Sequence, residues 1–581
     1  MAWYDEAVFY HIYPLGLTGA PKQNSYGEPE HRLNTLLPWI SHIKEIGFNA
    51  IYIGPLFESV GHGYETTDYK KLDSRLGTNE DLTNFVAQCH KQGIRVILDG
   101  VFNHTGRDFF AFQDIKKNRE NSQYKDWYCN VNFWGNNSYN DGFSYENWGG
   151  YDLLVKLNQR NPVVKDYICD VIRYWVKEYD IDGIRLDAAD VMDFEYMKAL
   201  RNVANEVKPD FWLMGEVIHG NYSRWANEGT LHSVTNYMLH KALFSGHNDH
   251  NYFEVAHTIK YVSNMVGNKL NLYSFADNHD VERIYTKLNN KAHFVPVHVM
   301  LYTLPGIPSI YYGSEFGIEG RKEKSSDDSL RPALNYEDYK DFVSTNACTK
   351  LIAALGKLRQ NTPALCYGDY KELVLQTGHF AYARSLDGKS VITAVNNADN
   401  EVYLDLQAGN SGEYVGVLTG EKVTVSGGHI HVRVPGNGGE IWIPSELMNE
   451  SFAPVKTVEI EKTTVAEETK VEIATEPVVE VVQETTVEET AVVETAVEES
   501  VEKTPVVEES VKEEPVNTEE IKPEKVVVDW NKPYEEMSVE ELQEAILEKM
   551  RKNGPVTEYM LGTVRENTHH GSLVNWVKSF N

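Results

Sequence analysis

Three short segments of the sequence each place a carboxylate directly after a strand-like run of residues. The three acids are Asp187, Glu216 and Asp280, and they follow one another along a chain in which strand-like and helix-like stretches alternate. A single acid after a strand carries little information, because Asp and Glu are common in loops. Three in order match the chemistry of glycosidic bond cleavage, which uses two carboxyl groups flanking the bond.

The residues around two of these acids predict different roles for them. Arg185 and Asp187 lie two positions apart, so in a strand their side chains point to the same face. A guanidinium that close lowers the pKa of a carboxyl group, which would keep Asp187 ionised and able to attack an anomeric carbon. Glu216 is flanked by Met214 and Val217 with no adjacent cation. Apolar surroundings raise a carboxyl pKa, which suits a proton donor.

Each acid also has a structural interpretation. Arg185 and Asp187 could form an ion pair that only stabilises the fold, and Glu216 could be a solvated loop acid. Asp280 could cap a helix that begins near Val281. The occurrence of all three at successive strand ends favours the chemical interpretation.

The elements that must position these acids form a regular pattern in the first 365 residues. Eight strand-like runs alternate with helix-like segments such as Asn34–Ile46 and Pro162–Tyr179. Eight parallel strands with intervening helices predict a (β/α)8 TIM barrel, with the active site at the carboxyl ends of its strands. An open, doubly wound sheet is the alternative. The strand-like runs are Val8–Pro14, Ala50–Phe57, Arg95–Phe102, Gly183–Ala188, Phe211–Val217, Leu231–Asn236, Leu272–Asn278 and Ser309–Glu315.

Two further domains accompany the barrel, which we assign to residues 1–104 and 161–365. Residues 105–160 are rich in Asn, Gly, Trp and Tyr and are too long for a plain loop, so they predict an inserted lobe after strand three. Residues 366–447 contain short β-branched runs separated by Gly-rich turns. This pattern predicts an antiparallel β-sandwich. The whole is therefore predicted to be an α/β protein whose barrel carries a C-terminal β-sandwich.

The remainder of the chain has a different composition. Residues 448–530 are dominated by Val, Thr, Glu and Pro, which predicts a disordered, acidic linker. Residues 531–581 contain a capping box at Ser538 and apolar residues at helical spacing. They predict a small helical C-terminal module, whose Trp576 and Phe580 form either its core or a docking surface for a protein partner.

The overall composition excludes several classes of partner and location. The net charge of −31 argues against nucleic acid or an anionic membrane as partner. No apolar run reaches 18 residues and the first residues show no signal-peptide pattern, so we expect neither a membrane span nor secretion. The five cysteines are scattered without CxxC spacing, which favours a reducing compartment. We therefore expect a cytoplasmic protein.

Four ordered motifs make the sequence similar to a known family. They are Asp99–His104, Gly183–Asp187, Gly215–Val217 and Phe275–Asp280, and they resemble the four signature regions of the α-amylase family, glycoside hydrolase family 13. The likeness covers roughly residues 4–445. The family's fifth signature is matched only in part, around Val155–Asn158.

The resemblance implies roles for individual residues. Asp187 would be the nucleophile, Glu216 the general acid and base, and Asp280 the stabiliser of the transition state. The remaining residues would bind the substrate; they are Tyr64, Asp99, His104, Arg185 and His279. Asp327 and Arg331 resemble a loop that contacts the next sugar, and a surface ion pair is the alternative for them.

The substrate class follows from the same resemblance. Ala188 directly after the nucleophile resembles members that act on α-1,4 bonds, so we expect hydrolysis of maltodextrins and malto-oligosaccharides by a retaining mechanism. A transglycosylase of the same family and a non-catalytic glucan-binding or scaffold protein are the alternatives. Aromatic residues of the inserted lobe could be sugar platforms or local core; they are Trp127, Trp134, Tyr139 and Trp148.

A calcium ion is the one cofactor that the resemblance raises. The residue matching Asn103 is a calcium ligand in α-amylases, together with acids of the inserted lobe. Here the lobe contains Asp126, Asp141 and Asp152 but no recognisable run of ligands. We therefore expect no required cofactor, with calcium as the alternative.

Overall fold

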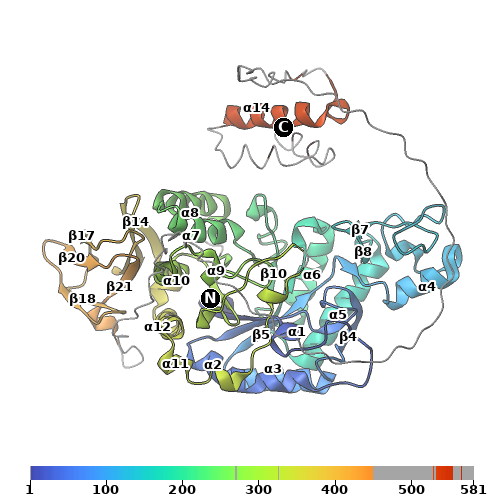
Figure 1. The fold of residues 1–581 in the computed structure, drawn as a ribbon, viewed down its shortest axis with the longest axis horizontal. Coiled ribbons are helices and arrows are strands. Elements are labelled where there is room, and N and C mark those ends of the chain that lie inside the picture. The colour runs from blue at the N-terminus through green and yellow to red at the C-terminus, as the bar shows by residue number, and fades with distance from the viewer. Residues whose placement is uncertain are drawn as a thin grey trace, which may run out of the picture. The chain divides into compact units, whose positions relative to one another are not determined.

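A computed structural model describes residues 2–267, 271–324, 326–448, 528 and 532–553, and the single positions 564, 573 and 577. The chain forms two compact units, Met1–Val471 and Glu472–Asn581 (Figure 1). Each unit is described by itself.

Eight parallel strands form the centre of the first unit. Their order is β11-β10-β9-β5-β2-β1-β13-β12, and a parallel bridge between Thr235 and Tyr273 joins the two ends of the sheet into a closed barrel. All eight predicted strands are therefore confirmed, and the open-sheet alternative is wrong. The strands are β1 (Phe9–Ile12), β2 (Ala50–Ile53), β5 (Arg95–Gly100), β9 (Gly183–Leu186), β10 (Trp212–Gly215), β11 (Ser233–Val234), β12 (Tyr273–Phe275) and β13 (Ile307–Tyr311).

The strands are buried on both faces because one face fills the barrel and the other meets the helices. Large side chains fill the interior, where the rings of Phe9 and Trp212 stack with 5.2 Å between their centroids. Tyr273 packs edge-on against Phe9. The interior of the barrel is therefore a packed core, and the polar residues lie beyond it at the carboxyl ends of the strands.

Helices surround the barrel, and four helices of the unit begin with a proline at their first or second position. The predicted helix Pro162–Tyr179 is confirmed as α5, with Asn161 capping its amino end. The predicted helix Asn34–Ile46 is divided into a 3-10 turn, Arg32–Leu36, and α2. The other helices of the unit are α1 (Pro14–Leu17), α2 (Leu37–Glu45), α3 (Asn79–Lys91), α6 (Phe194–Val207), α7 (Tyr237–Asn248), α8 (Tyr252–Val266), α9 (Ile284–Lys287), α10 (Phe294–Thr303), α11 (Phe342–Thr345), α12 (Ala347–Asn361) and α13 (Pro363–Tyr367).

Two excursions from the barrel carry residues toward the strand ends. After β2, the strands β3 (Phe57–Ser59) and β4 (Thr66–Leu72) pair in antiparallel fashion. After β5, the inserted lobe contains helix α4 (Phe110–Asn118) and a three-stranded sheet in the order β6-β8-β7. The sheet consists of β6 (His104–Thr105), β7 (Asn147–Trp148) and β8 (Tyr151–Lys156).

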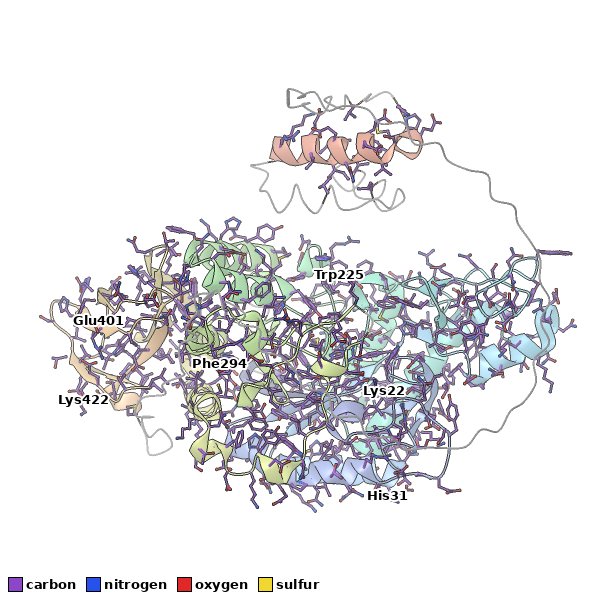
Figure 2. All side chains as sticks on the ribbon, in the orientation of Figure 1. Lys22, His31, Trp225, Phe294, Glu401 and Lys422 are labelled. Atoms are coloured by element: carbon purple, nitrogen blue, oxygen red, sulfur yellow. The ribbon has the colours of Figure 1, made fainter. Side chains whose placement is uncertain are left out.

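Residues after the barrel form a sandwich of two antiparallel sheets, as the sequence predicts. One sheet has the order β14-β15-β16-β21-β18-β19 and the other pairs β17 with β20. Helix α10 of the barrel packs on β16 and β21, and Phe294 of α10 is completely buried (Figure 2). The strands are β14 (Asp369–Leu375), β15 (His379–Leu386), β16 (Lys389–Asn396), β17 (Val402–Gln407), β18 (Glu413–Gly416), β19 (Lys422–Thr424), β20 (His429–Val434) and β21 (Gly438–Pro444).

The second unit contains helix α14 (Val539–Asn553). The predicted capping box at its start is confirmed, because the Ser538 amide donates to Glu541 and the Glu541 amide donates to the Ser538 hydroxyl. Leu542 and Ile546 of the helix pack with Leu573, Val577 and other buried residues. Apart from residues 448 and 528, the predicted linker lies outside the described residues, as do Trp576 and Phe580. No helix of the described chain is long and apolar enough to cross a membrane.

Candidate active site

Three carboxyl groups converge on a single guanidinium at the carboxyl ends of the barrel strands. Arg185, on β9, donates from Nη1 to Asp99 at 2.9 and 3.0 Å and to Asp187 at 2.9 Å. Its Nη2 lies 2.9 Å from Oε2 of Glu216, which follows β10. The Ala188 amide donates to the same Glu216 oxygen at 3.0 Å. Two of the three acids singled out from the sequence therefore contact the same arginine.

The electrostatics of this cluster correct two predictions. The pKa of Asp187 is raised well above its ordinary value, because burial outweighs the favourable effect of Arg185 and because Glu216 and Asp99 add like charge. The expectation of a lowered pKa for Asp187 is thus wrong. The pKa of Glu216 is raised as predicted, chiefly by burial. The predicted absence of a cation beside Glu216 is wrong, since Arg185 lies against it.

One positive charge faces three carboxyl groups in this buried cluster, so the cluster favours keeping a proton. The pKa values of Asp187 and Glu216 are both raised chiefly by burial, and the charge of Glu216 is a further cause for Asp187. Asp99 is held by further donors, since Tyr52 donates to it at 2.8 Å and Tyr64 at 3.2 Å. The raised pKa values of Asp187 and Glu216 favour a retained proton on one of these two acids.

Tyr64 and His279 form one wall beside the acids. The Tyr64 hydroxyl lies 2.5 Å from Nε2 of His279, and their rings are nearly parallel with centroids 5.8 Å apart. The ring of Tyr13 is also nearly parallel to that of His279, with 5.9 Å between the two centroids. Burial lowers the pKa of His279 well below its ordinary value, so the imidazole is neutral. Both residues predicted to bind substrate thus lie together beside Asp99.

Asp280 lies at the same edge, held by a second arginine. Arg331 donates from Nη2 to Asp280 at 2.9 Å and to Asp327 at 3.1 Å. Its Nε donates to the His279 carbonyl at 3.1 Å, and Arg331 is largely buried. The ion pair between Arg331 and Asp327 is therefore present, with Arg331 largely buried and Asp327 partly exposed. Asp280 does not cap a helix either, because α9 begins only at Ile284.

His104 is fixed by hydrogen bonds on both ring nitrogens. Asn103 donates from Nδ2 to Nδ1 of His104 at 3.2 Å, and Nε2 donates to the Tyr64 carbonyl at 3.1 Å. Burial lowers the pKa of His104 to about 4, so the ring is neutral at pH 7. The structure thus connects the predicted substrate-binding residues His104 and Tyr64 directly.

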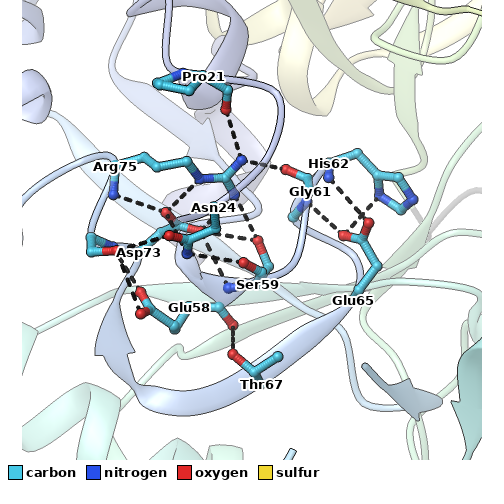
Figure 3. A network of polar contacts seen from close by, with 12 residues as sticks. Pro21, Asn24, Glu58, Ser59, Gly61, His62, Glu65, Thr67, Asp73 and Arg75 are labelled. Carbon is cyan, nitrogen blue, oxygen red and sulfur yellow. Dashed lines mark hydrogen bonds and ion pairs between the residues drawn. The ribbon is translucent and has the colours of Figure 1, made fainter. Parts of the chain in front are cut away.

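The loop that carries Tyr64 is clamped by Arg75, a residue that sequence analysis missed (Figure 3). The Arg75 guanidinium is buried, pairs with Asp73 at 2.7 Å and donates to the Gly61 carbonyl at 2.6 Å. From the other side, the Glu65 carboxylate accepts the amides of His62 and Gly63 at 3.2 and 3.0 Å. The clamp joins positions 14 residues apart, and an Arg in this position gives no sequence signal.

The residues around Asn103 do not fit a calcium ion. The Asn103 side-chain oxygen already accepts from Nε2 of Gln159 at 3.0 Å, and a cation at that oxygen would meet this N–H. Oε1 of Gln159 accepts the Asp193 amide at 2.7 Å. Among the lobe acids, Asp141 pairs with Arg107 at 2.7 Å. In the described chain, no group of three or more His, Cys, Asp or Glu residues is arranged to hold a metal ion.

A barrel with carboxyl groups gathered around an arginine at its strand ends has the arrangement of a glycosidase. Comparison with known proteins agrees, since the family model for the α-amylase catalytic domain matches residues 24–364. The chain is 32% identical over 423 residues to a cyclomaltodextrinase from Thermoanaerobacter pseudethanolicus, covering 69% of this chain and 71% of that protein. It is 27% identical over 425 residues to an intracellular maltogenic amylase from Bacillus subtilis, covering 70% and 71%.

A solved structure of a cyclomaltodextrinase shares the fold, with a TM-score of 0.67, 26% identity, and coverage of 76% of this chain and 78% of that chain. The chain therefore belongs to the α-amylase family, glycoside hydrolase family 13. It is a glycosidase of that family, which sets aside the alternative of a non-catalytic protein.

Proposed function

We propose that the protein is a retaining glycoside hydrolase that cleaves α-1,4-glucosidic bonds in maltodextrins and malto-oligosaccharides. The observation that carries the proposal is the contact of Arg185 with Asp99, Asp187 and Glu216 at the barrel strand ends. The names of the relatives, which include a cyclomaltodextrinase and a maltogenic amylase, support the same substrate class. Ala188 after the nucleophile supports the α-1,4 linkage.

In the first step, the Asp187 carboxylate attacks the anomeric carbon while Glu216 gives its proton to the leaving oxygen. The bond to the leaving sugar breaks, and a covalent glycosyl-enzyme forms with its ester at Asp187. The raised pKa of Glu216 suits this role, because the carboxyl group must hold a proton before the step. Arg185 contacts both acids and favours the charge that each carries when ionised.

In the second step, Glu216 is a carboxylate and takes a proton from water. The resulting attack at the anomeric carbon releases Asp187 and restores the original configuration. Asp280 would stabilise the positive charge at the ring in both transition states. Its charge is not free, because Arg331 pairs with it at 2.9 Å, so we expect its contribution to depend on Arg331.

The sugar in the cleavage subsite would be held by Tyr64, His104 and His279. Tyr64 and His279 present a stacked pair of rings, and His104 carries a neutral imidazole beside them. Asp327 and Arg331 would contact the next sugar. A polar site with aromatic faces suits a neutral carbohydrate.

The proposal includes no metal and no organic cofactor, because Gln159 already occupies the oxygen of Asn103. We also propose a cytoplasmic location, which is supported by the scattered cysteines and by the intracellular maltogenic amylase among the relatives. The C-terminal module would bind a protein partner, and neither nucleic acid nor a membrane is proposed as a partner.

Product analysis tests the function directly. Maltotriose, maltoheptaose, β-cyclodextrin, pullulan and sucrose are incubated with the enzyme, and the first products are read by anomer-resolved NMR. We expect α-anomers from the α-1,4-linked substrates, and β-anomers would refute retention. Asp187→Asn and Glu216→Gln should each lower kcat by about 10³-fold or more with an unchanged unfolding curve. Wild-type turnover in either variant would refute the assignment, and the yield of longer sugars separates hydrolysis from transglycosylation.

A further inference from the structure

A two-residue hairpin in the inserted lobe presents two aromatic rings beside the active site. Strands β7 and β8 are joined by Gly149 and Gly150, both with positive φ, of 64° and 83°. This turn brings Trp148 and Tyr151 directly opposite each other as a cross-strand pair. Paired residues lie on the same face of a hairpin, so the two rings are presented to the same side. We call Trp148–Tyr151 the aromatic hairpin.

The other aromatic residues of the lobe that could have bound sugar are placed differently. Trp127 is buried in the lobe's core. Tyr139 is covered by the Arg107 guanidinium, which lies 3.8 Å from its ring centroid. Trp134 is 97% exposed, on a turn of the lobe that makes no ring contact with an active-site residue in the described chain. Only Trp148 among these four meets a residue of the site.

The position of the aromatic hairpin is fixed relative to His104. Strand β8 pairs with β6 so that Lys156 lies opposite His104 and Val155 opposite Thr105. The strand that ends in the aromatic hairpin is thus hydrogen-bonded to the segment that carries His104. The Trp148 ring lies 5.9 Å from the His104 ring, with an angle of 32° between their planes.

Both rings are open to a ligand. Trp148 is 37% exposed and Tyr151 is 64% exposed. A Cβ atom added to Gly150 would meet nothing within 4 Å, and one added to Gly149 would lie 3.3 Å from the Tyr151 ring. Within the described chain, no cation lies over either ring, whereas Arg107 covers Tyr139. Two large aromatic side chains exposed beside a cluster of polar residues are typical of a ligand-binding surface.

We propose that Trp148 and Tyr151 form a sugar-binding subsite that takes the glucosyl unit adjoining the one in the cleavage subsite. The ring faces would stack on the apolar face of a pyranose, and the indole N–H and phenol O–H would meet its hydroxyls. The neutral chemistry of the rings selects an uncharged α-glucan. The inference rests on the proposed function, because His104 marks the cleavage subsite only if that function holds. It predicts that longer substrates gain affinity from the hairpin.

The test compares Trp148→Ala and Tyr151→Ala with Trp134→Ala, which removes a more exposed tryptophan of the lobe that makes no ring contact with His104. For each variant, kcat/KM is measured on maltoheptaose and on α-glucosyl fluoride, which fills only the cleavage subsite. Loss of a stacked aromatic ring is expected to lower the ratio of the two kcat/KM values about tenfold for Trp148→Ala, mainly through KM. The ratio for Trp134→Ala should equal that of the wild type.

A second readout separates binding from catalysis. In the Glu216→Gln background, maltoheptaose should change the tryptophan fluorescence, and an added Trp148→Phe should abolish most of that change. An unchanged ratio in Trp148→Ala, or a fluorescence change that survives Trp148→Phe, overturns the inference. So does dissociation of a dimer by Trp148→Ala in sedimentation, since the rings would then contact a second copy. A wild-type enzyme that cleaves neither substrate would instead overturn the proposed function.

Discussion

Gln159 offers a direct test of the proposal that the inserted lobe needs no cation where it meets the barrel. Its side chain is buried and bridges Asn103, at the end of β5, to the Asp193 amide at the start of α6. Asn103 in turn donates to His104. The change of interest is Gln159→Glu, which keeps an oxygen for the Asp193 amide but replaces the N–H that faces Asn103 with a second oxygen.

The magnitude follows from the groups left without partners. In Gln159→Ala, the completely buried Asn103 oxygen loses its donor, and the Asp193 amide loses its acceptor nearer to solvent. An orphaned buried group costs about 1–3 kcal/mol, and water can replace part of the second contact, so we expect a loss of about 2–4 kcal/mol. Gln159→Glu should cost at least as much, because two oxygens then face each other. Asn103 cannot turn its amide to help, since its N–H already serves His104.

A cation changes the prediction for one variant only. Two or more oxygen ligands at the former N–H position suit Ca²⁺, so calcium should restore part of the stability of Gln159→Glu. The assay is urea unfolding at about pH 7.5, once with EDTA and once with about 5 mM calcium. That concentration is high enough to fill even a weak site whose Kd for calcium is in the millimolar range. Gln159→Ala should be insensitive to calcium, and the exposed control Gln407→Glu should match the wild type in both conditions.

The outcome that refutes this reasoning is equally specific. If EDTA destabilises the wild type or abolishes its activity, and calcium restores it, the enzyme requires a cation that Gln159 does not replace. If Gln159→Glu is as stable as the wild type in EDTA, the bridge to Asn103 does not carry the proposed free energy. In both Gln159 variants, we expect kcat/KM on maltotriose to decrease together with the free energy of unfolding. The reason is that His104 loses its fixed orientation.

Three further predictions follow from the charges of the described residues. In Glu216→Gln, the acidic limb of the pH–rate profile with α-glucosyl fluoride should move to lower pH, because the charge of Glu216 is one of the causes that raise the pKa of Asp187. An acidic limb at the wild-type pH would contradict this effect of Glu216 on Asp187. Burial lowers the pKa of His298 to about 4, so the unfolded chain binds a proton below about pH 6.5 that the folded chain excludes. Stability is therefore lost as pH falls from 6.5 toward 4, and His298→Leu should reduce the loss between pH 7 and pH 5 by about 2 kcal/mol in urea titrations. Arg75→Met should cost about 3–5 kcal/mol by leaving Asp73 buried and unpaired, and Asp73→Asn in that background should recover part of it; additive losses would contradict a pair.

The sequence predicts the barrel well because its strands carry a local signal. Each is a short apolar run bounded by turn residues, and burial on both faces makes that run continuous, as in Ala50–Ile53. The order of the acids follows from the same alternation, since Asp187 and Glu216 come directly after β9 and β10 and Asp280 follows β12 by a few residues. Pro162 likewise marks the start of α5 within its own segment.

The surroundings of the acids were not predictable in the same way, because they depend on residues far apart in the sequence. The neighbours of Glu216 in sequence are apolar, yet Arg185 reaches it from the adjacent strand. Gln159 lies 56 residues from Asn103, and nothing in the run around it distinguishes it from a surface glutamine. Strand position is a local property, whereas a pKa depends on all charges that the fold brings within a few ångströms.

The charges of the site explain why its two arginines differ in effect. Arg331 meets Asp280 and Asp327 at the rim, where both acids are partly exposed and Arg331 is largely buried. Arg185 is buried against three acids. When Glu216 holds a proton, the other two acids carry two negative charges and Arg185 carries one positive charge, so the cluster has a net charge of −1. A buried excess of one negative charge is costly before substrate binds, which is why the pKa of Asp187 is raised. The same negative charge becomes favourable when positive charge develops at the anomeric carbon. The charge that destabilises the free enzyme therefore stabilises the transition state.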